Sequence, residues 1–91
     1  MIVRVRLPTH LHQYSGGLAD VQVDCTAPAT LADVMAALDA RWPGVRHRLI
    51  DEQDGIRRHI RIFVGSAAAP GIAVPVGEGE DVMIVAALSG G

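Results

Sequence analysis

The stretch Val82-Met-Ile-Val-Ala-Ala-Leu-Ser-Gly-Gly91 closes the chain and largely decides how the rest of it folds. Residues 82–88 are all apolar, which is typical of a strand buried in the middle of a sheet. A serine and two glycines follow directly. Because glycine has no Cβ, a glycine pair at a chain end can enter a narrow channel that other residues would block. We therefore predict a final central strand and, over about residues 88–91, a flexible tail that presents a carboxylate.

Two further strands are predicted near the N-terminus. Residues 2–7 and 18–24 alternate apolar and polar side chains, which is the pattern of strands with one buried face. The segment 8–17 between them contains proline, serine and two glycines, so it is predicted to be a loop. We expect the two strands to pair antiparallel, as a hairpin with a long connection.

Apolar residues recur at helical spacing over residues 31–42 and predict one amphipathic helix. Thr30 is a favourable N-cap residue, and Asp33 suits the positive end of the helix dipole. Pro43-Gly44 ends the helix, and residues 45–50 are expected to add a short helical turn. The stripe that faces the core consists of Leu31, Val34, Met35, Leu38 and Trp42.

The remaining elements complete a sheet that the helix can cover. Residues 59–64 alternate as a third strand, residues 51–58 read as a polar loop, and a short strand is expected around Ile72–Val76. This order indicates an α+β fold of the β-grasp (ubiquitin-like) type, a mixed four- to five-stranded sheet with one main helix packed across it. The first and last strands would lie side by side in the middle, and residues 1–91 would form a single domain. A ferredoxin-like fold is the alternative, against which the single long helix weighs.

Composition narrows the classes of function. The 91 residues carry a formal net charge of -2, which argues against a nucleic-acid or anionic-membrane partner. Cys25 is the only cysteine, so no disulfide is expected within one chain. No apolar stretch approaches the ~20 residues of a membrane helix, and the N-terminus lacks the pattern of a signal peptide. The expected compartment is the cytoplasm.

Strand alternation also predicts a surface for protein partners. Between the buried positions of the central strands, every second side chain must point outward. The outward residues are the apolar Phe63, Met83 and Val85, bordered by Arg4, Arg6 and Arg61. We call these six residues the outer-face patch, because an exposed apolar area with a charged rim marks a protein interface. A shifted strand register, or cover by the loop 65–76, would abolish it.

Other reactive residue types are interpreted as structural. His10 and His12 have no carboxylate or thiol nearby in the sequence, so we expect a solvated loop rather than a metal site. Cys25 is expected to pack as a small apolar residue. The basic stretches 46–48 and 57–61 are separated by three acidic residues and are interpreted as solvated surface rather than a phosphate site.

Five segments of the chain carry a resemblance to a known family: 3–8, 30–44, 60–65, 79–82 and the terminal Gly90-Gly91. In these segments the chain resembles the MoaD/ThiS-type ubiquitin-like sulfur carrier proteins of bacteria, over essentially its whole length. Leu7-Pro8-Thr9 and Ser15-Gly16-Gly17 are similar to the actinobacterial branch that serves cysteine synthesis. The chain departs from the family at Gly79-Glu80-Asp81-Val82, where many members have Gly-Asp-Glu-Val. It also has Ala-Ala-Leu-Ser before the glycine pair, where many members have a proline and Val-Ala.

The resemblance implies that the Gly91 carboxylate is adenylated by an E1-like enzyme and that a sulfur donor converts the glycyl adenylate to a thiocarboxylate. The sulfur would go to an acceptor enzyme in the synthesis of molybdopterin, cysteine, thiamine or a thio-metabolite. Ser89, Gly90 and Gly91 would enter the partner together with contacts from the outer-face patch. The chain has no lysine and no P-loop motif, so ATP is expected to bind the partner and this chain to bind no cofactor or metal. It would then be a substrate protein or a small non-catalytic subunit, monomeric when free.

Two other functions remain open. The chain could be a ubiquitin-like modifier whose Gly91 is joined to lysines of target proteins, or a β-grasp binding module that does not use its tail. Because the chain has no lysine, it cannot form self-linked chains through a side chain. This favours a carrier or a single modification.

Overall fold

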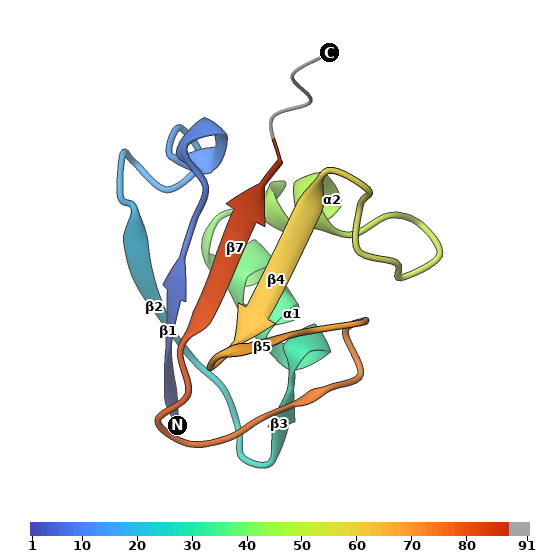
Figure 1. The fold of residues 1–91 in the computed structure, drawn as a ribbon. Helices are drawn as coiled ribbons and strands as arrows, with labels where there is room; N and C mark the ends of the chain where they lie inside the picture. Colours follow the sequence, from blue (N-terminus) through green and yellow to red (C-terminus); the bar gives the residue numbers. More distant parts are fainter. Residues whose placement is uncertain (88–91) are drawn as a thin grey trace.

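The computed structural model describes residues 1–87 and shows one helix packed across a five-stranded mixed sheet (Figure 1). The strands lie in the order β2-β1-β7-β4-β5. Their bounds are β1 Ile2–Arg6, β2 Asp20–Asp24, β4 Ile60–Val64, β5 Ala67–Ala68 and β7 Val82–Ala86. This arrangement confirms the β-grasp fold that the sequence predicts.

The first and last strands are neighbours in the middle of the sheet, as predicted. β1 and β7 pair in parallel, with Val5 opposite Val82, whereas β1 and β2 form the expected antiparallel hairpin. β4 pairs antiparallel with β7 on its other side. β7 is therefore hydrogen-bonded along both edges and lies in the middle of the sheet.

Helix α1 spans Leu31–Arg41 and begins with a capping box. Thr30 Oγ1 accepts a hydrogen bond from the Asp33 backbone N–H at 3.4 Å, and the Asp33 carboxylate accepts one from the Thr30 N–H at 2.8 Å. The predicted stripe is buried at its first four positions, Leu31, Val34, Met35 and Leu38. The predicted helix is one residue too long, because Trp42 is the C-cap and is only half buried.

Two short helices close one end of the molecule. α2 spans Val45–Leu49, as expected, and buries its first and last residues against the core. A 3₁₀ helix, η1, spans Thr9–Leu11 within the loop after β1 and buries Leu11. Gly44 joins α1 to α2 with a φ of +99°, a left-handed conformation that favours glycine. Within residues 1–87, neither α-helix is long and apolar enough to cross a bilayer.

The short strand predicted around Ile72–Val76 is shorter in the structure. Strand character within it covers only Pro75–Val76, the strand β6, which pairs with β3 (Ala29–Thr30) in a separate two-stranded sheet. The carbonyls of Ile72 and Val74 instead accept hydrogen bonds from the first N–H groups of α1. These groups have no partner inside the helix, so the segment caps the helix rather than extending the main sheet. Neither β3 nor β5 was predicted.

Cys25 lies at the end of β2 and is buried, as expected for a packing residue. Burial raises the pKa of its thiol, and a protonated thiol is a poor nucleophile. β7 ends at Ala86, so the predicted strand 82–88 is one residue too long over residues 82–87, and residue 88 lies outside the described residues.

Candidate functional site

The candidate site is the end of β7, where the predicted tail begins. The Ala87 N–H donates a hydrogen bond to the His59 carbonyl at 2.7 Å, which extends the pairing with β4 by one residue. We call Ala86 and Ala87 the tail base. The predicted tail residues Ser89, Gly90 and Gly91 lie outside the described residues, and their role stays a prediction.

The outer-face patch lies on the surface of the sheet that α1 does not cover. Phe63 stands opposite Met83, and Arg61 opposite Val85, in the β4–β7 ladder. Arg6 stands opposite Met83 on the other side, in the β1–β7 ladder. Met83 and Val85 are each 40% exposed, and Phe63 is half buried. The strand register is therefore the predicted one, and the loop 65–76 does not cover the two exposed residues.

The arginine rim of the outer-face patch is partly neutralised by acids of the same chain. Arg6 Nε donates to Asp20 Oδ1 at 2.9 Å, and this hydrogen bond lowers the pKa of the Asp20 carboxyl. Arg4 Nε lies 3.6 Å from Asp81 Oδ1. Arg61 is exposed and makes no ion pair within residues 1–87. A partner would thus meet one unpaired arginine and two already paired ones.

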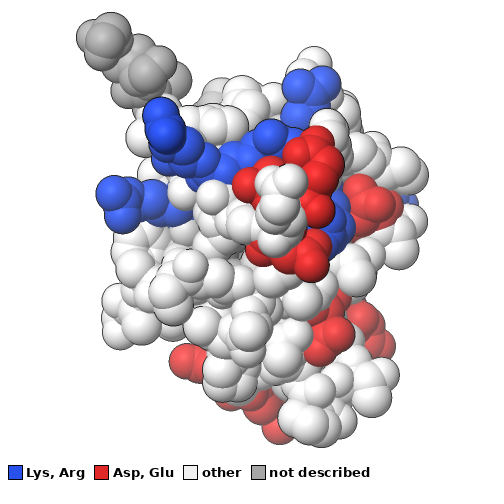
Figure 2. Space-filling view, turned by 90° about the vertical axis from the view of Figure 1, so that its right-hand side faces the viewer, with Lys and Arg blue, Asp and Glu red and all other residues white. Residues whose placement is uncertain are grey.

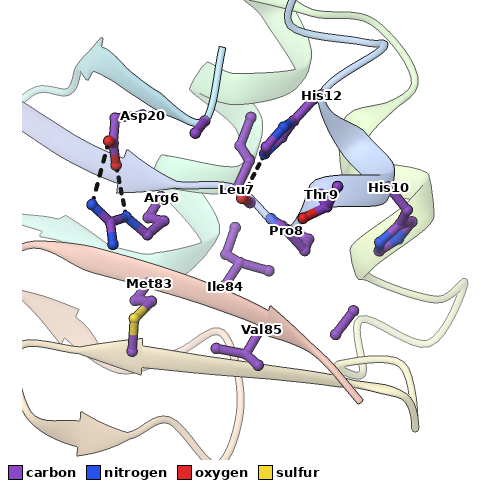
Figure 3. Close-up of a pocket in the computed structure, with 12 residues that line it drawn as sticks. Arg6, Leu7, Pro8, Thr9, His10, His12, Asp20, Met83, Ile84 and Val85 are labelled. Carbon is purple, nitrogen blue, oxygen red and sulfur yellow. Dashed lines mark hydrogen bonds and ion pairs between the residues drawn. The ribbon is translucent and has the colours of Figure 1, made fainter. Parts of the chain in front are cut away.

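A groove of about 800 Å³ adjoins this patch and runs up to the tail base (Figure 3). Met83 and Val85 of β7 form one wall, and the chain leaving β1 at Leu7 and Pro8 forms the other. His12 Nε2 lies 3.1 Å from the Leu7 carbonyl, and this contact holds the loop after β1 against the end of that strand. The position of this wall depends on how the long loop after β1 folds, so strand alternation could not reveal the groove.

A second hollow shares His10 with this groove and gathers basic side chains from three segments. It is lined by His10, His47, Arg48, Arg57 and His59, which we call the basic cluster. The sequence suggested only separate stretches of solvated surface here, so the interpretation missed this grouping. Within the described part of the chain, no group of three or more His, Cys, Asp or Glu residues has the geometry to hold a metal ion.

Comparison with known proteins identifies relatives of this chain. No protein-family model matches the chain. The chain is 30% identical to the sulfur carrier protein CysO of Mycobacterium tuberculosis and to that of Mycobacterium bovis, and the match covers all of each chain.

Solved structures agree with this match. One chain in the crystal structure of the BexX/CysO complex from Amycolatopsis orientalis superposes on this chain with a TM-score of 0.86 at 27% identity. The superposition covers 98% of this chain and 99% of that chain. CysO of Mycobacterium tuberculosis superposes with a TM-score of 0.83 at 28% identity, covering 94% and 99%. SAMP1 from Haloferax volcanii, at 23% identity and a TM-score of 0.83, shares the fold. The chain therefore belongs to the family of ubiquitin-like sulfur carrier proteins that includes CysO.

Proposed function

We propose that this protein carries sulfur as a thiocarboxylate at Gly91 and delivers it to an enzyme of cysteine synthesis. The observation that carries the proposal is the full-length match to CysO sulfur carriers in a chain that carries Gly90-Gly91 a few residues after the central strand β7. The family match makes cysteine synthesis the favoured pathway over molybdopterin, thiamine or thio-metabolite synthesis. The exposed patch and groove beside the tail base support a role in which another protein grips this end of the molecule.

The chemistry requires a partner that binds ATP. Sulfide cannot displace an oxygen of a carboxylate directly, because the leaving group would be oxide. An oxygen of the Gly91 carboxylate attacks the α-phosphorus of ATP, the bond to the β-phosphate breaks, and pyrophosphate leaves. Sulfide from a donor then attacks the carbonyl carbon of the adenylate, AMP leaves, and the thiocarboxylate remains. The chain has no lysine and no P-loop, which supports an E1-like enzyme as the site of ATP binding.

The protein is then a substrate of two enzymes, one that activates its tail and one that accepts its sulfur. The solved complex of CysO with BexX is an example of a related carrier held by another protein. The tail has to be narrow to enter an active site, and a glycine pair has the smallest possible cross-section. The rest of the chain supplies a rigid body that the partner can hold.

The proposal is tested by intact-mass analysis after incubation with the E1-like enzyme of the same genome, ATP and sulfide. We expect the wild-type mass to rise by the difference between one sulfur and one oxygen atom. Deletion of Gly91, or one alanine added after it, should abolish the shift. Neither change should alter the free energy of unfolding, because both lie beyond the tail base.

A wild-type protein that keeps its carboxylate, in a reaction where the same enzyme also fails to exchange pyrophosphate into ATP, would overturn the proposal. Conjugation to proteins is a separate outcome and would be seen as target lysines that carry the C-terminal peptide. SAMP1 shares the fold with this chain, and at 23% identity this likeness does not favour a modifier role over a carrier role.

A further inference from the structure

The basic cluster brings two arginines and three histidines together at one end of the fold. Its five side chains surround a hollow of about 300 Å³, and none of the residues that line it is acidic. His10 comes from η1, His47 and Arg48 from α2, and Arg57 and His59 from the segment that enters β4. The ring centroids of His10 and His59 lie 6.2 Å apart. Segments distant in the sequence thus converge on one concave surface.

Contacts within the fold position the two arginines of the basic cluster. Arg57 Nε donates to the His47 carbonyl at 2.7 Å, which ties the segment before β4 to α2. The Arg48 guanidinium lies 5.4 Å from the centre of the Tyr14 ring, a cation–π contact that limits its movement. Among the ion pairs within residues 1–87, the one that involves the basic cluster joins Arg57 to Glu52, at 3.9 Å. Arg48 makes no ion pair in that range, so much of the positive charge stays available.

The basic cluster adjoins the tail base. The His59 carbonyl accepts the hydrogen bond from the Ala87 N–H, and His10 lines both the basic hollow and the apolar groove. Figure 2 shows arginine side chains on the upper part of one face, near the point where the described chain ends, beside a group of acidic side chains, with further acidic side chains below. The tail base therefore lies next to both an apolar groove and a basic hollow.

We propose that the basic cluster docks onto acidic side chains that the adenylating enzyme carries at the mouth of its tail channel. This inference rests on the proposed function. The four residues 88–91 reach only ~13 Å when extended at ~3.3 Å each, so the rim of the channel must lie against the tail base when Gly91 meets the nucleotide. Aspartate and glutamate at that rim accept hydrogen bonds from arginine in a bidentate geometry. Each histidine adds at least one further N–H donor.

The location favours a protein carboxylate over a phosphate of the reacting nucleotide. The nucleotide must lie at the far end of the extended tail, whereas the cluster lies at its base. Charged contacts at such a position raise the rate of encounter and set the orientation of the two proteins, and they leave the chemical step unchanged. The cluster is thus expected to act on the KM for the carrier and not on kcat.

The test measures ATP–pyrophosphate exchange by the adenylating enzyme at varied carrier concentration. For Arg48→Gln/His59→Gln we expect the KM for the carrier to rise about three- to tenfold, with kcat unchanged within about twofold. Arg48→Glu should raise KM further, because it places a like charge against the acidic rim. Added NaCl should raise the KM of the wild type more steeply than that of the double variant.

Arg46→Gln is the matched control. Arg46 lies on the same short helix and loses the same charge, but it pairs with Asp54 at 3.0 Å and does not line the hollow. We expect its KM to equal that of the wild type. His10→Gln serves as an independent variant in a different segment, and thermal unfolding of all variants verifies that each one is folded.

An unchanged KM in the folded cluster variants, or an equal rise in Arg46→Gln, would show that the cluster does not dock the enzyme. Binding of inorganic phosphate by the carrier alone, together with unchanged KM values, would identify a small-anion site and would also overturn the inference. In both cases the wild type would still be adenylated, so the proposed function would stand. If the wild type supports no exchange at all, the proposed function fails and this inference fails with it.

Discussion

One face of β7 packs in the core, and the other is the face that we propose for recognition by a partner. Val82 and Ile84 are 1% and 2% exposed and belong to the core, whereas Met83 and Val85 between and after them are each 40% exposed. All four are apolar, so residue type alone does not separate the two roles. The alternation of the strand does, because successive side chains point to opposite sides of the sheet. Substitutions on the two faces should therefore have different consequences.

The largest effect on stability is expected on the inner face. Ile84→Ala removes a side chain that is almost fully buried, and the cavity it leaves should lower the free energy of unfolding by about 2–5 kcal/mol. Urea denaturation monitored by circular dichroism measures the loss. The KM for the adenylating enzyme should stay close to that of the wild type at temperatures where the variant is folded. A loss of less than about 1 kcal/mol would mean that the core relaxes around this position.

On the outer face, substitution should weaken binding more than it weakens folding. Met83→Ala should cost no more than about 1 kcal/mol of stability, yet raise the KM for the adenylating enzyme about five- to tenfold, because the side chain is free to contact a partner. Phe63→Ala should lower both stability and affinity, because the Phe63 side chain is half buried. Its effect on binding is therefore harder to separate from its effect on folding. An unchanged KM for both variants would remove the outer-face patch from the partner interface.

The smallest effect is expected at Asp51, in a loop outside both faces of β7. Its Oδ1 accepts hydrogen bonds from the Gly55 and Gln53 N–H groups at 2.9 Å each, and these bonds lower the pKa of the carboxyl. A pKa below that of the unfolded chain stabilises the fold at pH values above the unfolded pKa, and the contribution is lost as the pH falls. Asp51→Asn should thus be slightly less stable than the wild type at neutral pH.

The difference in the free energy of unfolding between Asp51→Asn and the wild type should shrink below a pH of about 4, near the pKa of an unperturbed aspartate. Urea midpoints at neutral and acidic pH measure it. A constant difference across this range would show that the loop is stabilised by something other than the ionised carboxylate. The variant should keep the wild-type KM, so it also serves as a baseline for the substitutions on β7.

Periodic patterns in the sequence were sufficient to predict the centre of the fold. Alternating stretches identify β1 and β4, helical spacing identifies α1, and a continuous apolar run identifies β7. The two-residue repeat of strand geometry then places Met83 and Val85 outside and Ile84 inside. Local patterns succeed here because each of these elements buries one continuous face, so the pattern is repeated several times along it.

The elements that were missed have no repeated pattern. β3 and β5, which were not predicted, have two residues each. β6 was predicted as a longer strand around 72–76 and keeps only two residues, because the carbonyls of Ile72 and Val74 cap the start of α1. The basic cluster could not be predicted for a related reason. Its histidines and arginines are separated by long stretches of sequence and meet only because η1, α2 and the start of β4 close the same end of the sheet. Tertiary packing, rather than local preference, creates that part of the site.

The central position of β7 also determines how the protein resists mechanical load. When a partner grips the chain end and the body is pulled away, the force runs along β7, roughly at right angles to its hydrogen bonds with β1 and β4. Both ladders are then loaded in shear, and their bonds must yield together rather than open one after another. A strand at the edge of the sheet would share the force with a single neighbour. In the proposed role, a carrier that is pulled out of an enzyme by its chain end would therefore keep its fold.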